Sequence, residues 1–119
     1  PTAGLHFTPR VLQALEAKGV QRAEVTLSVG LGTFRGVSHD DIRQHQMDAE
    51  YYSLPEETAR LVRETKAAGG RVVAVGTTAV KTLETVAQRC EGLPTEAMSG
   101  WSELFIYPGF RFQVVDAML

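Results

Sequence analysis

The stretch at residues 71–84 constrains this chain more than any other part of its sequence. Its apolar run 72–75 does not alternate, which predicts a strand covered on both faces, as in a parallel sheet. Gly76 then permits a tight turn, and Thr77 or Thr78 can cap a helix that starts there. Such turns often hold anionic ligands in α/β enzymes, although an ordinary capped turn explains the same residues equally well.

Local signals predict three helices. Thr8 can cap a helix that starts at Pro9 and ends near Gly19. Residues 55–68 have a proline in the first turn and apolar side chains on one face, and Gly69-Gly70 follows them. A third helix is expected at residues 78–89, with Val80, Leu83, Val86, Ala87 and Cys90 on its buried face.

The strand pattern is less complete. Residues 23–29 alternate and predict a strand with one solvent-exposed face, while the apolar run 104–107 predicts a buried strand. Residues 40–52 give no clear secondary structure, and residues 91–100 read as a connection. The order of helices and strands favours an α/β fold with right-handed units on a largely parallel sheet.

Composition excludes several classes of protein. The chain has 119 residues, 44% of them hydrophobic, which suits one globular domain with a modest core. A net charge of −2 gives no overall positive field for nucleic acid, and the single Cys90 excludes an internal disulfide. No apolar run is long enough to span a membrane, so we expect a cytoplasmic protein.

Both ends of the sequence suggest a longer polypeptide. Residues 1–4 read as the middle of a loop, and the run 112–119 is strand-like and apolar. Left unpaired, such a run exposes apolar surface and backbone groups. We therefore expect a fragment.

Two segments carry candidate chemistry. His45, Asp48 and Glu50 lie within six residues and can supply a general acid and base, although a solvated loop explains them as well. With one histidine and no cysteine there, no metal site is predicted. The glycines of the 30–34 segment allow backbone to approach a ligand, with Phe34 as a stacking surface, or simply mark a turn.

Five segments resemble one enzyme family when they are read together. In order they are 1–8 (PTAGLHFT), 29–34 (VGLGTF), 45–51 (HQMDAEY), 75–78 (VGTT) and 105–109 (FIYPG). They are similar to the S-adenosylmethionine:tRNA ribosyltransferase-isomerases of queuosine biosynthesis, nearly from end to end. Each motif alone is weak, but five in the expected order are specific.

The resemblance implies an unusual reaction. The ribosyl group of S-adenosylmethionine moves to an aminomethyl-deazaguanine base in the tRNA anticodon region and isomerises to epoxyqueuosine, releasing adenine and methionine. S-Adenosylmethionine is then a co-substrate, without a prosthetic group or a metal. The resemblance further implies a monomeric parent enzyme whose three-layer α/β/α domain carries an inserted β-barrel domain. Residues 1–119 would be the central to C-terminal-side part of the α/β domain, truncated at both ends and inactive alone.

The resemblance also implies site residues. His45, Asp48 and Glu50 form the catalytic set, in which Glu50 stabilises the sulfonium or takes the adjacent proton, and His45 shuttles protons. The implied substrate-binding set is His6, Phe7, Gly32, Thr33, Phe34, Gly76, Thr77, Thr78, Tyr107, Pro108 and Gly109. Two positions depart from the family pattern: Asp48 stands where relatives typically carry a histidine, and Lys81 replaces a frequent arginine.

Two other functions fit the same residues. One is a non-catalytic α/β module that binds an anion or RNA, and the other is a generic α/β enzyme domain in which the motif order is a coincidence. Release of adenine from S-adenosylmethionine, dependent on tRNA carrying the modified base, separates these alternatives from the transferase.

Overall fold

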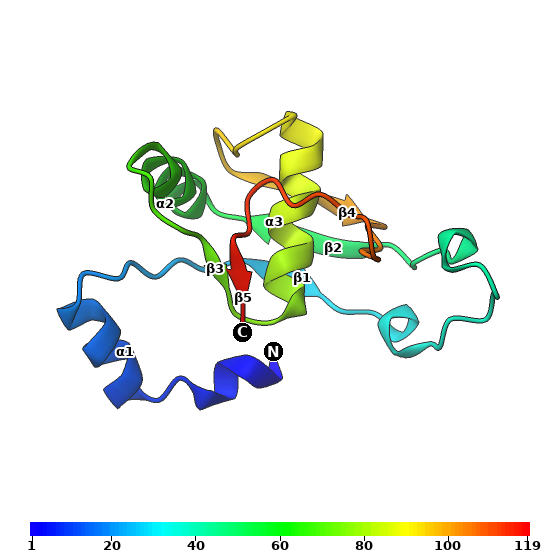
Figure 1. Ribbon diagram of the computed structural model, residues 1–119, viewed down its shortest axis with the longest axis horizontal. Helices are drawn as coiled ribbons and strands as arrows, with labels where there is room; N and C mark the ends of the chain where they lie inside the picture. Colours follow the sequence, from blue (N-terminus) through cyan, green and yellow to red (C-terminus); the bar gives the residue numbers. More distant parts are fainter.

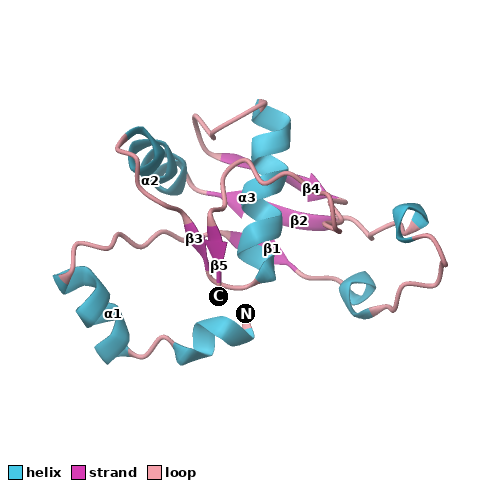
Figure 2. Cartoon of the chain, in the orientation of Figure 1, coloured by secondary structure: helices cyan, strands magenta, loops and turns pink.

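A computed structural model describes all residues, 1–119, and contains both helices and strands (Figures 1 and 2). The α-helices are α1 (Pro9–Ala17), α2 (Glu56–Ala67) and α3 (Thr77–Cys90). The strands are β1 (Thr26–Ser28), β2 (Glu50–Leu54), β3 (Val73–Ala74), β4 (Met98–Ser102) and β5 (Ala117–Met118). Three short 3-10 helices complete the list: η1 (Thr2–His6), η2 (Leu31–Phe34) and η3 (Ile42–Gln44).

The strands form two small sheets. β2 is the central strand of an antiparallel sheet with the order β1-β2-β4, and β3 pairs in parallel with β5. Helix α3 packs against all three strands of the antiparallel sheet and also contacts β3 (Figure 1). This helix therefore connects the two sheets.

The predicted α/β class is confirmed, but a largely parallel sheet is not. Only the β3–β5 pairing is parallel, whereas both pairings of β2 are antiparallel. The run at 72–75 is also not covered on both faces, because Val73 is 46% exposed while Ala74 is buried. The apolar run indicated a strand correctly, but it could not reveal which neighbours would cover it.

All three predicted helices are confirmed, and each predicted end lies within two residues of the observed one. The Thr8 side chain caps α1 by accepting a hydrogen bond from the Val11 N–H at 3.3 Å. Two glutamates in the first turn of α2 suit the helix dipole. The cap of α3 was predicted wrongly, because Gly76, and neither threonine, is its N-cap residue.

The strand predictions were less accurate. β2 begins within residues 40–52, which gave no clear pattern, and β4 begins within the predicted connection 91–100. Residues 104–107 form no strand, although they are apolar. In β2 the inward side chains are Glu50, Tyr52 and Leu54, each at most 2% exposed. A buried charge beside an exposed tyrosine obscures the alternation that a strand normally shows.

The core lies between α2, α3 and the antiparallel sheet. Its buried hydrophobic residues are Tyr52, Leu54, Ala59, Val62, Leu83, Val86, Ala87 and Val114. Four of the five residues predicted for the buried face of α3 are buried, while Cys90 is half-buried at the end of the helix. No helix combines the length and the apolar character of a membrane span.

Candidate functional site

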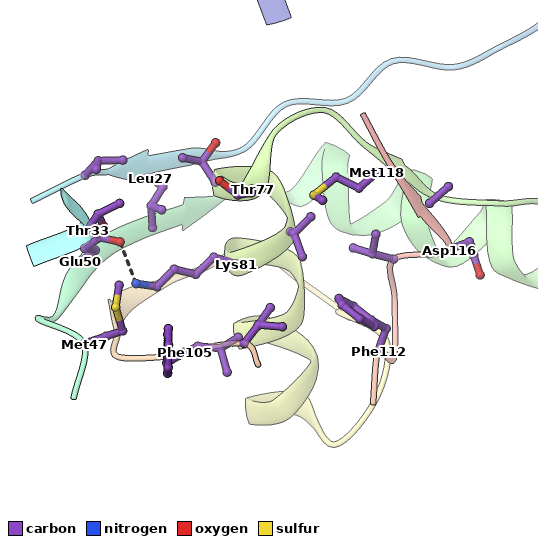
Figure 3. A pocket seen from close by; sticks show the side chains of 17 residues that line it. Leu27, Thr33, Met47, Glu50, Thr77, Lys81, Phe105, Phe112, Asp116 and Met118 are labelled. Carbon is purple, nitrogen blue, oxygen red and sulfur yellow. Dashed lines mark hydrogen bonds and ion pairs between the residues drawn. The ribbon is translucent and has the colours of Figure 1, made fainter. Parts of the chain in front are cut away.

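The candidate site is a cavity of about 480 Å³ beside the N-terminal half of α3 (Figure 3). One wall comes from β1, β2 and the η2 segment, a second from residues 104–106, and a third from residues 112–118. The lining residues are Leu27, Val29, Thr33, Met47, Glu50, Thr77, Thr78, Val80, Lys81, Leu104, Phe105, Ile106, Phe112, Val115, Asp116, Ala117 and Met118. Most of these side chains are apolar, as is usual for small-molecule sites, and few polar groups stand among them.

A buried ion pair joins the first wall to α3. Glu50, at the start of β2, accepts a hydrogen bond from the Lys81 ammonium at 2.7 Å, and both side chains are buried (Figure 3). The other carboxylate oxygen accepts from the Gly30 N–H at 3.0 Å and from the Thr33 hydroxyl. Glu50 therefore holds the segment that enters η2 against the N-terminal half of α3.

The electrostatics keep Glu50 ionised. Burial by itself raises the pKa of Glu50, but hydrogen bonds from Lys81, Thr33 and Gly30 outweigh that effect and bring the pKa below its ordinary value. At neutral pH the site therefore contains a carboxylate matched by an ammonium. A carboxylate with a lowered pKa is a weak proton acceptor, which favours an electrostatic or positioning role.

The start of α3 forms another part of the cavity lining. Gly76 has φ +87°, a conformation that glycine adopts without strain, so the predicted tight turn is present. The exposed Thr77 and the half-buried Thr78 both line the cavity. The Gly76 N–H already donates to the Leu119 carbonyl at 2.8 Å. A ligand at this turn would therefore meet Thr77 and Thr78, which follow Gly76.

An aromatic row extends from the cavity. The ring of Phe105, which lines it, packs against His45 with ring centroids 4.6 Å apart, and against Tyr107 at 5.8 Å. His45 and Tyr107 are thus connected to the cavity through Phe105, although neither belongs to its lining.

Asp48 and Gly32 meet outside the cavity. A Cβ at Gly32 would lie only 2.6 Å from the Cβ of Asp48, so glycine is needed for this close approach. Asp48 also forms an exposed ion pair with Arg35 at 3.6 Å. The structure therefore places Asp48 against η2, away from the lining.

The predicted site residues thus fall into three groups. Glu50, Thr33, Thr77 and Thr78 line one cavity. A second group lies next to a lining residue in the chain or packs against one: Gly32, Phe34, His45, Asp48, Gly76 and Tyr107. The remaining predicted residues do neither: His6, Phe7, Pro108 and Gly109. Phe34 is 81% exposed, so its ring is free of the cavity despite the neighbouring Thr33.

Sequence reasoning missed much of the lining. Lys81 was noted only as a substitution, yet its spacing of three and four residues from Thr78 and Thr77 puts it on the same helix face. Phe105 was read as part of a buried strand. Met47 lies in the motif 45–51 but was given no role, and nothing local indicated Phe112, which reaches the cavity only through the tertiary fold.

Comparison with known proteins points to one family. Residues 1–119 match the family model described as queuosine biosynthesis protein. The chain is 56% identical to an S-adenosylmethionine:tRNA ribosyltransferase-isomerase of Natranaerobius thermophilus and 52% identical to one of Macrococcus caseolyticus, over all 119 residues. It spans about a third, 34%, of the length of these relatives.

A solved structure agrees with this match. The crystal structure of S-adenosylmethionine tRNA ribosyltransferase from Thermotoga maritima is similar with a TM-score of 0.73 and 46% identity. The similarity covers 98% of this chain and 34% of that one.

Proposed function

The chain belongs to the queuosine biosynthesis protein family over residues 1–119, and from this premise we propose that it is part of an S-adenosylmethionine:tRNA ribosyltransferase-isomerase. In the proposed reaction the ribosyl group of S-adenosylmethionine moves to an aminomethyl-deazaguanine base in the anticodon region of tRNA and isomerises to epoxyqueuosine. Adenine and methionine leave. The names of the relatives support the enzyme class.

The observation that carries the proposal is the cavity around Glu50 and Lys81. It offers an apolar enclosure with a buried carboxylate, which suits an S-adenosylmethionine co-substrate whose sulfonium is positive. Phe105 and Phe112 supply aromatic surface for adenine, or for the cation itself. Thr77 and Thr78, at the positive end of α3, supply hydroxyls and dipole for an anionic group. That group is the methionine carboxylate or a tRNA phosphate.

The proposed roles follow the electrostatics. Glu50 stabilises the sulfonium rather than accepting the adjacent proton, because its pKa is lowered and it stays ionised. Lys81 keeps Glu50 charged and oriented. His45, packed on Phe105 at the border of the cavity, shuttles a proton to adenine or to the amine of the base.

The wider architecture is proposed for the longer protein. It comprises a three-layer α/β/α domain, to which the parallel pair β3–β5 and the helices α2 and α3 contribute, and an inserted β-barrel domain. Residues 1–119 form the central to C-terminal-side part of the α/β domain. The parent enzyme is proposed to be a cytoplasmic monomer that uses S-adenosylmethionine as a co-substrate without a prosthetic group.

The test measures adenine released from S-adenosylmethionine by the full-length protein, with tRNA that carries the precursor base. We expect Glu50→Gln and His45→Ala each to lower turnover by about 100-fold, as removal of electrostatic or proton-transfer groups typically does. Glu57→Gln, on the exposed face of α2, is the matched control and should be neutral.

Two outcomes count against the proposal. If both variants turn over near the wild-type rate, the residue roles are wrong. If the wild-type protein binds tRNA but releases no adenine, the non-catalytic RNA-binding module is the better description.

A further inference from the structure

Glu84 is a charged residue at the centre of α3 that no proposed catalytic step uses. Its side chain is completely buried, with 0% of the residue exposed. One carboxylate oxygen accepts hydrogen bonds from the N–H groups of Val114 at 3.0 Å and Val115 at 2.8 Å, and the other accepts from Gln113 N–H at 2.8 Å. Three consecutive backbone donors thus converge on one buried carboxylate.

This arrangement is specific for a carboxylate. Glu84 takes part in none of the ion pairs of the structure, so the backbone donors alone compensate its burial. A buried N–H group without a partner, such as that of Val114, is costly, and the two oxygens of Glu84 together serve all three donors. The path of residues 113–115 therefore depends on the side chain at position 84.

That path leads directly into the cavity. Phe112 and residues 115–118 line its third wall, so residues 113–114 connect two lining segments, and Figure 3 shows Phe112, Asp116 and Met118 on the side of α3 away from Glu50. Lys81 lies three residues before Glu84 and binds the wall around Glu50. Two buried charges of one helix thus hold opposite walls of the same cavity.

We propose that Glu84 is a positioning residue for the co-substrate: its carboxylate holds residues 113–115 and thereby sets the wall that contacts the ligand in the cavity. The inference rests on the proposed function, since that function places S-adenosylmethionine in this cavity. Glu84 itself does not line the cavity and touches no reacting atom.

The experiment compares Glu84→Gln and Glu84→Leu with the wild type in the full-length protein. Gln keeps one oxygen for Val114 and Val115 but turns an N–H₂ group towards the Gln113 N–H, whereas Leu removes every acceptor. We expect the KM for S-adenosylmethionine to rise roughly 5- to 20-fold in the Gln variant. The rise should be larger in the Leu variant, while the KM for tRNA stays within about twofold of the wild-type value.

The matched control is Thr58→Val. Thr58 is also buried, and its hydroxyl donates to the Glu24 carbonyl at 2.6 Å, but it does not line the cavity. This variant should lower the melting temperature and leave both KM values unchanged. If the Leu variant does not fold, the KM of the Gln variant for S-adenosylmethionine still tests the positioning role of Glu84.

The experiment distinguishes failure of the proposed function from failure of the positioning role of Glu84. A wild-type protein without adenine release defeats the proposed function and this inference with it. An active wild type whose Glu84→Gln variant loses thermal stability, but keeps its KM for S-adenosylmethionine, overturns the positioning role alone.

Discussion

At the scale of single residues, the decisive feature is the buried pair of Glu50 and Lys81. Removing two charges from water is expensive, and the attraction between them compensates only when the remaining hydrogen-bonding capacity is also used. Here the second oxygen of Glu50 accepts from Gly30 and Thr33, so the carboxylate is fully satisfied. Besides the electrostatic role proposed for Glu50, the pair therefore fixes the wall of the cavity, and the stability of this wall depends on both residues.

Lys81→Met should reveal this dependence. The variant leaves a buried carboxylate without its cation, so we expect the free energy of unfolding to fall by about 3–5 kcal/mol at pH 7. Lys81→Arg keeps the charge and should retain most of the stability. Denaturant unfolding of both full-length variants against the wild type measures the difference.

The contribution of Glu50 to the free energy of unfolding depends on pH with a definite sign. In the wild type the pKa of Glu50 is lowered, so its stabilising contribution is present above the ordinary value of 4.5 and is lost as pH falls through the lowered pKa. In Lys81→Met the carboxylate takes up a proton at higher pH, which relieves the burial penalty. The difference in stability should therefore shrink from pH 7 towards pH 4.5, and a constant difference would contradict this account.

At the scale of elements, the start of α3 controls how the helix enters the cavity. Gly76 combines a φ of +87° with a close neighbour, since a Cβ at this position would lie 2.4 Å from the Cβ of Pro1. Its N–H donates to the last residue, Leu119, and its carbonyl accepts from Val80. The turn thus brings both ends of the chain to one place, as the adjacent N and C labels of Figure 1 show.

Gly76→Ala should destabilise the protein through this turn. We expect a loss of about 1–3 kcal/mol, because alanine is strained at positive φ and the added Cβ displaces Pro1. Gly30→Ala is the control, since Gly30 has φ −91° and nothing within 4 Å of an added Cβ. Thermal unfolding of both variants tests the expectation, and equal melting temperatures would be evidence against it.

At the scale of the whole molecule, Asp116 connects parts that are distant in sequence. Its carboxylate accepts from Lys66 of α2 at 2.6 Å and from the Val72 N–H, next to β3, at 2.7 Å. The Lys66 ammonium first, and then the Val72 N–H, lower the pKa of Asp116. One side chain at the edge of the cavity thus joins α2 to the parallel pair β3–β5.

Asp116→Asn should loosen this junction. The amide keeps one acceptor but loses the charge, so we expect stability to fall by roughly 1 kcal/mol at neutral pH. The wild-type contribution is present above the ordinary value of 3.8 and disappears as pH falls through the lowered pKa. Urea unfolding at pH 7 and at pH 3 measures both effects, and a loss that is as large at pH 3 would argue for a packing defect instead.

Much of the helical structure was predictable from local sequence. The cap at Thr8, the proline before α2 and the apolar face of α3 act within a few residues, so helix bounds follow from short segments. The five motifs also led to the family without any coordinates. Of the predicted site residues, Glu50, Thr33, Thr77 and Thr78 line one cavity, but their contacts with one another could not be predicted and their roles stay predictions.

The sequence by itself determined the helices, the α/β class and the family, because each depends on residues that are neighbours in the chain or on short signatures in order. Only the tertiary structure decided that β2 is the central strand, that residues 104–106 line a cavity, that Lys81 pairs with Glu50, and that Glu84 binds the backbone of residues 113–115. These features arise from contacts between residues far apart in sequence. Such contacts depend on strand pairing and on the compensation of buried charge, which no local pattern records.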